Sequence, residues 1–572
     1  MEGLKSLSAS DRAFVESGLV NRYAIAFATI LALVALTAAA LYQVRLPGIG
    51  PKSAPAEAFS AGRAISHLQI IAAAPHPTGS AGLDQVRHYI TTFLSGLGLQ
   101  AETQATPTVT NILARIGGTN SSGTDRSKAV LLVAHMDSVV AGPGAGDNSS
   151  AVSMLLEVAR AITAGTPLKN DIIFLFTDGE ETGLQGAKAF VYRHPWAKDV
   201  GVVMNFDARG VGGPVLMFQT SGNNDWVISD FAKSSTRVTA TSLLPDLYRL
   251  LPNDTDFTVF KGAGYDGLNF AFVNGAMYYH TRFDTLDNVD ARSIQLEGDA
   301  TLALSRHFGI VEIGKTGGGN DTYFDLFGSL FFYSRSWNVP LCLFVLALYC
   351  GLVALAAVKK RIQWAGMAMG FAISLMGVLA ATVAALAITT LAPFRAEPGS
   401  MNFAQSDART NFYLIGLVLS SLAAVSAVYG LFFKRGWADS IALGGSFCCL
   451  ITMMLLLAYL PGGSYLFAWP LLFSLIGLAY AVFAAKPDRR PPYGRWTLMF
   501  ACVVPAVLLL TPVIYLIFVG LTLKMSIAVV VLLSVSLVLL YPLLGIVSTA
   551  NRWFLPVASA VASCSMIFAA VH

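Results

Sequence analysis

The second half of the sequence consists of long apolar runs, and this feature limits the possible folds more than any other. From about residue 338 to residue 572, apolar runs alternate with short polar or basic loops. A transmembrane helix needs about 20 mostly apolar residues, because the hydrocarbon core of a bilayer is about 30 Å thick. Only 13% of the residues are charged, whereas a soluble domain carries about 25%. The sequence therefore predicts a membrane domain of about eight transmembrane helices over residues 338–572.

A further apolar run lies near the N-terminus. Residues 23–44 carry no charge and follow a polar tail, residues 1–22, that contains three basic residues. The apolar core of a cleaved signal peptide is shorter, about 7 to 15 residues. We therefore interpret residues 23–44 as an uncleaved transmembrane anchor and the proline-containing residues 45–58 as a linker. The prediction for the whole chain is about nine transmembrane helices.

The loops between the apolar runs differ in charge, and this difference predicts their orientation. Basic residues are concentrated in every second loop, whereas the other loops hold only Arg395, Arg409 and Lys524. The basic loops contain Lys359, Lys360, Arg361, Lys434, Arg435, Lys486, Arg489, Arg490, Arg495 and Arg552. Short loops rich in Lys and Arg face the cytoplasm, as does the basic N-terminal tail. The segment before residue 338 is then on the non-cytosolic face, in the lumen of the endoplasmic reticulum or vacuole or in a bacterial periplasm. With nine spans, His572 lies on the same face.

Residues 59–315 have the composition of an ordinary globular domain. Short β-branched or aromatic runs, which are typical of buried strands in a parallel sheet, alternate there with patterns typical of helices. We expect strands near residues 111–116, 129–133, 171–176, 201–206 and 268–273. Strands that alternate with helices predict a three-layer α/β domain with a mixed, mostly parallel sheet. Residues 316–337 are expected to be a second linker.

Imidazole and carboxylate side chains follow several of these strands. In open α/β sheets, ligands bind beyond the carboxyl ends of the strands, so these side chains are expected to meet at one sheet edge. A mixture of imidazole and carboxylate groups suits a zinc site with an open coordination position. The candidate ligands are His135, Asp147, Glu181, Asp207 and His280. Taken alone, Asp207 favours a helix cap or a turn former, the pair Glu180-Glu181 favours a solvated surface, and His280 is equally well a satisfied polar residue. The ordered set indicates metal.

Two metal ions a few ångströms apart need a bridging carboxylate, and Asp147 is the natural bridge. One ion is expected to bind His135, Asp147 and Asp207. The other is expected to bind Asp147, Glu181 and His280. Each ion then has three protein ligands, which leaves positions for a water molecule that the metals activate.

Two further carboxylates are expected to act in catalysis. Asp137, two residues after His135, can accept a hydrogen bond from the ring nitrogen of His135 that does not bind metal. Glu180 lies next to Glu181 and is the candidate general base for the substrate water. Asp284 either holds the loop around His280 or is an ordinary turn former.

These motifs, in this order, resemble the co-catalytic zinc aminopeptidases of metallopeptidase family 28. The matching motifs are His135-Met136-Asp137, Gly146-Asp147-Asn148, Asp178-Gly179-Glu180-Glu181-Thr182-Gly183, Asn205-Phe206-Asp207 and Tyr279-His280-Thr281-Arg282-Phe283-Asp284-Thr285. The resemblance covers residues 59–315. The turn Pro77-Thr78-Gly79-Ser80 and the many downstream spans are most similar to the endoplasmic reticulum metallopeptidase and vacuolar membrane protease branch. The resemblance implies the same roles for the ligands and for Glu180 and Asp137; many relatives have Glu at the position of Asp207.

The sequence thus favours a membrane-anchored zinc exopeptidase, most naturally an aminopeptidase, with a peptide or protein substrate and the lipid bilayer as its partners. Two alternatives remain at this stage. One is a zinc acyltransferase similar to glutaminyl cyclases, which share much of the ligand pattern. The other is a membrane scaffold or transporter whose peptidase domain is inactive. No dense basic patch with interleaved aromatic residues occurs in the sequence, so nucleic-acid binding is not expected.

Overall fold

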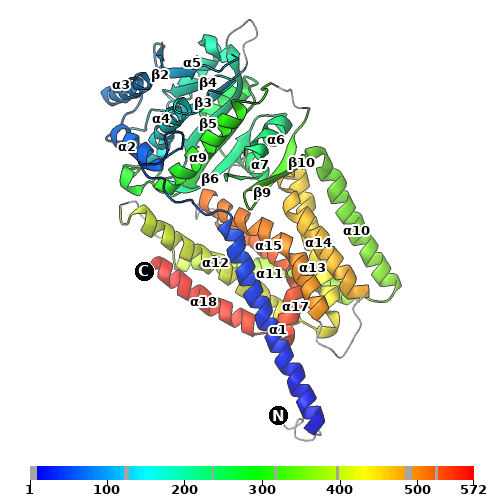
Figure 1. The fold of residues 1–572 in the computed structure, drawn as a ribbon. Helices are drawn as coiled ribbons and strands as arrows, with labels where there is room; N and C mark the ends of the chain where they lie inside the picture. Colours follow the sequence, from blue (N-terminus) through cyan, green and yellow to red (C-terminus); the bar gives the residue numbers. More distant parts are fainter. Residues whose placement is uncertain are drawn as a thin grey trace. The chain divides into compact units, whose positions relative to one another are not determined.

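The computed structural model describes residues 9–120, 128–234, 237–314, 318–393, 399–483, 493–521 and 526–572 (Figure 1). The chain forms two compact units, which we call the helical unit and the sheet unit. The helical unit contains Met1–Gln43, Asn338–Arg395 and Ala408–His572, and the sheet unit contains Val44–Trp337 and Ala396–Asp407. Some sequence-based expectations lie outside the described residues. These are the first eight residues of the N-terminal tail and the basic loop residues Arg395, Lys486, Arg489, Arg490 and Lys524.

The sheet unit is built around an eight-stranded mixed sheet with the strand order β1-β2-β4-β3-β5-β8-β6-β7. The strands are β1 (Ala101–Ala105), β2 (Thr110–Ile116), β3 (Ala129–His135), β4 (Ile172–Thr177), β5 (Val200–Ala208), β6 (Gly212–Thr220), β7 (Thr239–Ala240) and β8 (Gly267–Asn274). The four central strands, β4, β3, β5 and β8, are parallel to one another. Toward the edges, β2 pairs antiparallel with β4 and with β1, and β6 pairs antiparallel with β8, whereas β7 at the other edge is parallel to β6. The carboxyl ends of the central strands therefore meet at one edge of the sheet.

Helices cover both faces of the sheet, because successive residues of a strand point to opposite faces. In β3, Val130 and Leu132 belong to a large apolar core on one face, and Leu131 and Val133 belong to a smaller core on the other. The large core includes residues of α2 (Ala61–Ile71), α3 (Ala81–Gly96), α4 (Ser150–Thr163), α6 (Asp225–Lys233) and α9 (Ala291–Phe308). The smaller core includes residues of α5 (Gln185–Arg193) and α8 (Asp256–Gly262). The predicted three-layer α/β domain with a mixed, mostly parallel sheet is confirmed.

Two segments that the sequence suggested as linkers are ordered parts of the sheet unit. In residues 45–58, the guanidinium group of Arg63 donates hydrogen bonds to the carbonyl groups of Lys52 and Ala54, at 2.8 Å each. The segment at residues 316–337 contains a two-stranded sheet, β9 (Asp321–Leu326) and β10 (Ser329–Ser334). Parts of both segments therefore make hydrogen bonds within the sheet unit.

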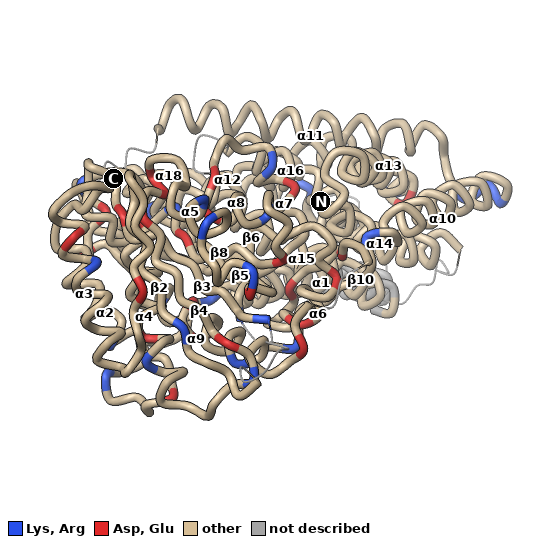
Figure 2. Tube along the Cα trace, turned by 90° about the horizontal axis from the view of Figure 1, so that it is seen from above, with Lys and Arg blue, Asp and Glu red and all other residues tan. Residues whose placement is uncertain are grey.

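The helical unit contains α1 (Ala9–Tyr42), α10 (Asn338–Val358), α11 (Trp364–Leu391), α12 (Phe403–Phe432), α13 (Ala438–Tyr459), α14 (Tyr465–Phe483), α15 (Tyr493–Leu521), α16 (Ser526–Val538), α17 (Tyr541–Asn551) and α18 (Phe554–Val571); the first turn of α12 belongs to the sheet unit. Within the described residues, eight helices are long and apolar enough to cross a membrane, or nine if the bent pair α16–α17 is one span. Figure 2 shows few charged residues on α11, whereas the elements of the sheet unit carry many.

One of the expected spans is interrupted in the structure. In place of one continuous helix, α16 and α17 are separate helices that meet at 76°. Pro542 lies in the first turn of α17. Proline lacks a backbone N–H and disfavours helical geometry at the preceding residue, which explains a break at this point.

Candidate metal centre

The parallel central strands bring the predicted ligands to one edge of the sheet. His135 is the last residue of β3, and Asp207 is near the end of β5. Glu181 follows β4, which ends at Thr177. His280 lies in the loop after β8, which ends at Asn274. Since β4, β3, β5 and β8 are adjacent and point the same way, the segments that follow them share one end of the sheet.

The five predicted ligands form two groups of three that share Asp147. In each group the potential ligand atoms lie within 4.8 Å of one another. In the first group, Nε2 of His135 lies 3.2 Å from Oδ1 of Asp147 and 3.6 Å from Oδ1 of Asp207. In the second, Nε2 of His280 lies 3.2 Å from Oδ2 of Asp147 and 3.1 Å from Oε1 of Glu181. Asp147 therefore presents one carboxylate oxygen to each group.

The position of Asp147 depends on Asp284, which comes from the loop that carries His280. The backbone N–H groups of Gly146 and Asp147 donate to the two carboxylate oxygens of Asp284, at 2.6 and 3.1 Å. On the other side, the amide of Asn148 donates to the backbone oxygen of Phe206, at 2.8 Å. Of the two roles considered for Asp284, holding a loop fits the structure, but the loop it holds is that of Asp147.

Asp137 contacts the segment of the two glutamates more closely than it contacts His135. Its carboxylate accepts hydrogen bonds from the backbone N–H groups of Glu180 and Glu181, at 3.2 and 3.3 Å. The hydroxyl of Thr78, in the turn before α3, donates to the same carboxylate at 3.1 Å. Nδ1 of His135 lies 3.0 Å from the backbone oxygen of Asp137 but 3.7 Å from its carboxylate. The nearest acceptor for the second ring nitrogen of His135 is thus the main chain of Asp137, not its side chain.

Glu180 lies in the field of the same acidic cluster but in neither group of ligands. Burial raises the pKa of its carboxyl group to about 10; His135 opposes this shift, and the charges of Asp207, Asp256 and Asp147 add to it. Such a group holds a proton easily when no cation is near. A buried carboxyl group with a raised pKa beside a cluster of ligands is typical of a catalytic acid or base.

Asp256 is a buried carboxylate near the centre that the sequence analysis did not single out. It accepts a hydrogen bond from the hydroxyl of Thr177, the last residue of β4. Burial raises the pKa of Asp256 to about 7. No local signal distinguishes it, since an aspartate at the start of a helix such as α8 is common and stabilising.

The donor set fits divalent cations. Burial disfavours ionised carboxylates, and it raises the pKa of both Asp207 and Glu181. Burial acts in the same direction on Asp147, but its contacts with His135 and His280 lower its pKa overall. Crowded, buried carboxylates of this kind are stable when ionised only beside positive charge, and a divalent cation supplies it. Three carboxylates and two imidazoles suit zinc in particular.

The two histidines differ in exposure and in backbone geometry. The side chain of His135 is 3% exposed, whereas that of His280 is 38% exposed. His280 has a φ angle of +58°, in the left-handed region that residues other than glycine seldom adopt. Its ring stacks on that of Tyr279, with centroids 3.7 Å apart. The centre is therefore closed on the side of His135 and open on the side of His280.

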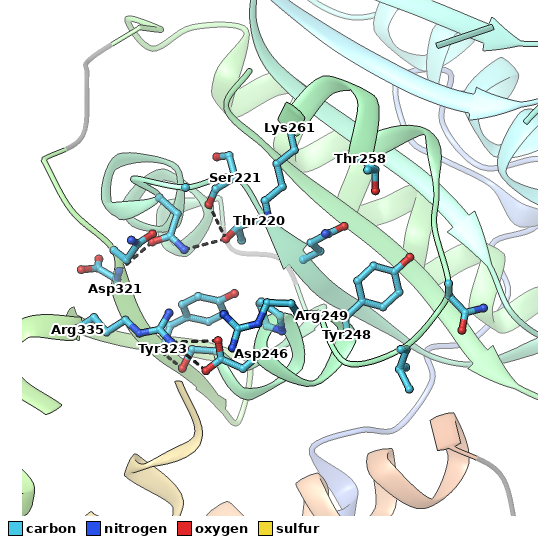
Figure 3. A pocket seen from close by; sticks show the side chains of 18 of the residues that line it. Thr220, Ser221, Asp246, Tyr248, Arg249, Thr258, Lys261, Asp321, Tyr323 and Arg335 are labelled. Atoms are coloured by element: carbon cyan, nitrogen blue, oxygen red, sulfur yellow. Dashed lines mark hydrogen bonds and ion pairs between the residues drawn. The ribbon is translucent and has the colours of Figure 1, made fainter. Parts of the chain in front are cut away.

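A cavity of about 440 Å³ lies near the metal centre but includes none of its candidate ligands (Figure 3). It is lined by residues from the end of β6, from α7 (Leu243–Tyr248), from α8 and from the start of β9. Because β6 runs antiparallel to β8, Thr220 at its end lies level with Leu268, away from Asp207. Tyr248 lines the cavity; burial raises the pKa of its hydroxyl, and the charges of Asp207 and Glu180 add to the shift.

Comparisons with known proteins show which family and which relatives the chain resembles. Residues 111–305 match the sequence model of Peptidase family M28. Endoplasmic reticulum metallopeptidase 1 from Homo sapiens is 32% identical over 260 residues, which are 44% of this chain and 27% of that protein. Vacuolar membrane protease from Candida albicans (strain WO-1) is 35% identical over 244 residues, which are 40% of this chain and 28% of that protein. The chain thus spans little more than a quarter of the length of the curated relatives it matches.

Solved structures are similar at lower identity. An aminopeptidase from Aneurinibacillus sp. strain AM-1 has 13% identity and a TM-score of 0.37, and the match covers 45% of this chain and 95% of that one. A glutaminyl cyclase from Porphyromonas gingivalis has 18% identity and a TM-score of 0.35, and the match covers 43% of this chain and 97% of that one.

Proposed function

We propose that the chain is a membrane-anchored, zinc-dependent exopeptidase of the aminopeptidase type, and the match of residues 111–305 to Peptidase family M28 supports this. Its substrates are peptides or proteins, from which it removes N-terminal residues. The sheet unit works on the non-cytosolic face of the membrane that holds the helical unit, as the distribution of basic loop residues predicts.

The observation that carries this proposal is the pair of ligand groups that share Asp147. His135, Asp147 and Asp207 would hold one zinc ion, and Asp147, Glu181 and His280 would hold a second. Each group offers three protein ligands, which is the number typical of catalytic zinc sites that keep an open position. When bound, zinc supplies a Lewis acid that polarises a carbonyl group and lowers the pKa of water.

Glu180 is the proposed general base. Its carboxylate takes a proton from the attacking water and returns it to the leaving amine. Asp137 is a positioning residue, because its carboxylate holds the backbone N–H groups of Glu180 and Glu181 and so fixes the direction of both side chains. Glu181 can then bind a metal ion while Glu180 contacts the water.

The preference for a free amino terminus follows from charge. Five carboxylates lie in or next to the two ligand groups: Asp137, Asp147, Glu180, Glu181 and Asp207. When all are ionised, their negative charge exceeds the positive charge of two divalent ions. A substrate end that carries an ammonium group compensates the excess, whereas a blocked end does not.

The test uses the purified full chain in detergent, with zinc counted by mass spectrometry and products identified for three peptides. One peptide has a free amino terminus, its matched control is acetylated there, and the third begins with glutamine. We expect two zinc ions per chain, stepwise removal of residues from the free peptide, and no reaction of the acetylated one. One zinc ion together with pyroglutamate from the third peptide would instead identify a glutaminyl-cyclase-like acyltransferase. Zinc binding without any reaction would point to a scaffold or transporter.

A further inference from the structure

A short segment that lies between two candidate membrane spans is part of the sheet unit. Residues 396–407 follow α11 and include the first turn of α12, yet they group with Val44–Trp337. Of these, residues 399–407 are described. We call residues 399–407 the α12 entry segment.

Phe403 of the α12 entry segment is buried against the base of the loop that carries His280. Its ring is 7% exposed and packs with Val211 and Tyr278. The packing of this ring requires a glycine at position 275, because a β-carbon there would lie 2.9 Å from the ring of Phe403. Gly275 also has a φ angle of +76°, which glycine adopts without strain. The first residue after β8 is thus shaped to receive a side chain from the start of α12.

Hydrogen bonds connect the α12 entry segment to the two ends of the same loop. At the first end, the amide of Asn274 donates to Oδ1 of Asp407 at 2.6 Å, and the hydroxyl of Tyr278 donates to the backbone oxygen of Met401 at 3.1 Å. At the second end, the side-chain oxygen of Asn288 accepts a hydrogen bond from the backbone N–H of Phe403, at 3.1 Å.

Asn288 also connects this contact to the metal centre. Its amide donates to the backbone oxygen of Phe283, at 2.9 Å. The next residue, Asp284, holds the backbone N–H groups of Gly146 and Asp147. A continuous path of contacts therefore runs from the first residue of α12 to the carboxylate that both ligand groups share.

The first turn of α12 is shaped for this contact. Asn402 and Gln405 bond each other's backbone N–H groups through their side chains, which is the arrangement of a helix capping box. Phe403 and Ser406 are buried, whereas Ala404 and Gln405 are exposed. This spacing places one helical face on the loop and leaves the other free.

We propose that the α12 entry segment positions the loop of residues 275–288, and with it His280 and Asp284, for binding of the second metal ion. The loop has no strand and only one turn of 3-10 helix, and His280 is held there in a left-handed conformation. Such a conformation persists only where surrounding contacts impose it. This inference rests on the proposed function in one respect, that the ion is zinc.

The test compares Phe403→Ala with Ala404→Ser, a matched control on the exposed face of the same helical turn, in the full-length protein. Amide hydrogen exchange of residues 275–288 should become at least about tenfold faster in Phe403→Ala, while β3 and β4 keep their protection. Affinity for the second zinc ion should fall by roughly 10- to 100-fold, with the first ion retained, since partners behind metal ligands contribute this much. The control should match the wild-type protein in both measurements.

A second, milder variant tests the proposal even if Phe403→Ala does not fold. In Tyr278→Phe, only the hydroxyl that contacts the α12 entry segment is removed. It should show the same two effects to a smaller degree. Exchange and zinc affinity equal to those of Ala404→Ser would overturn the proposal, and so would faster exchange with unchanged zinc affinity. Neither measurement needs turnover, so an inactive wild-type protein would refute the proposed function and leave this inference standing.

Discussion

Glu180 and Glu181 are neighbours in the chain, yet their surroundings differ sharply. Oε1 of Glu181 lies 3.1 Å from Nε2 of His280, whereas Glu180 belongs to neither ligand group. Glu180→Gln is expected to lower kcat by about 10²- to 10⁴-fold, the usual contribution of a general base, with both zinc ions retained. Glu181→Gln is the control and should lose the second ion. Turnover of Glu180→Gln near that of the wild-type protein would remove Glu180 from the role of base.

A second buried glutamate gives the stability of the protein a dependence on pH. Glu297 in α9 is 1% exposed, and among the described residues neither of its carboxylate oxygens has a hydrogen-bond partner. Burial raises the pKa of Glu297 to about 8, and the charge of Asp207 adds to this shift. In an unfolded chain the pKa of a glutamate side chain is about 4.3. Between these values the unfolded state binds fewer protons, so stability falls as the pH rises from about 4.3 to about 8.

Glu297→Gln should remove this dependence, because an amide does not titrate in the range. The melting temperature of the variant minus that of the wild-type protein is expected to grow from pH 5 to pH 8, at a fixed zinc concentration. The slope for the wild-type protein can reach about 1.4 kcal/mol per pH unit. At pH 5 the variant should gain nothing, since a buried amide without partners is also costly. Parallel melting curves at all pH values would contradict a buried, protonated Glu297.

At the level of elements, α9 packs closely against Phe59 because residue 298 is a glycine. A β-carbon on Gly298 would collide with the ring of Phe59, which is 3% exposed. Gly298→Ala has two opposing effects: better helix propensity gains about 1 kcal/mol, and overpacking costs about 1 to 3 kcal/mol. We expect a net loss of melting temperature. Combining the change with Phe59→Leu should recover part of it, and a melting temperature above that of the wild-type protein would show that the ring moves aside freely.

The central strands were predictable from sequence because both of their faces are buried. A strand such as β3 is then apolar throughout, and its residues are recognised without knowledge of their partners. The five candidate ligands could be singled out because each follows such a strand or an adjoining loop in a recognisable motif. Asp207, for example, comes directly after a short apolar run that is typical of a buried strand.

Other elements leave no comparable pattern. Strand β1, with the sequence Ala-Glu-Thr-Gln-Ala, lies at the sheet edge and is partly exposed. Its place is set by pairing with β2, not by its own composition. The contact of Phe403 with Tyr278 joins positions far apart in the sequence. Nothing in either local sequence indicates the other, so only the structure connects the α12 entry segment with the metal centre.

For the whole molecule, one contact bears on the number of membrane crossings. Nη2 of Arg409, near the start of α12, donates to the backbone oxygen of His572 at 2.9 Å. Between them the single-helix spans α12, α13, α14, α15 and α18 are odd in number. The chain returns to its starting side only if the bent pair α16–α17 adds one more crossing. The contact therefore favours nine spans.

This count predicts the positions of two reporters. A reporter fused after His572 should lie on the non-cytosolic face, and a control reporter inserted after Lys360, in a basic loop, should lie in the cytosol. Accessibility to a membrane-impermeant label in sealed vesicles distinguishes the two faces. A cytosolic reporter after His572 would mean that α16–α17 enters and leaves the bilayer on one side.

The place of the α12 entry segment in the chain also sets an order of biosynthesis. Residues 399–407 are translated after α10 and α11, so the zinc-binding loop cannot gain its support until both helices have left the ribosome. The proposed second metal site would thus remain incomplete while the first helices of the chain are being inserted. A translation intermediate arrested before residue 399 should expose the stretch around His280 to added trypsin, and one arrested well beyond α12 should protect it.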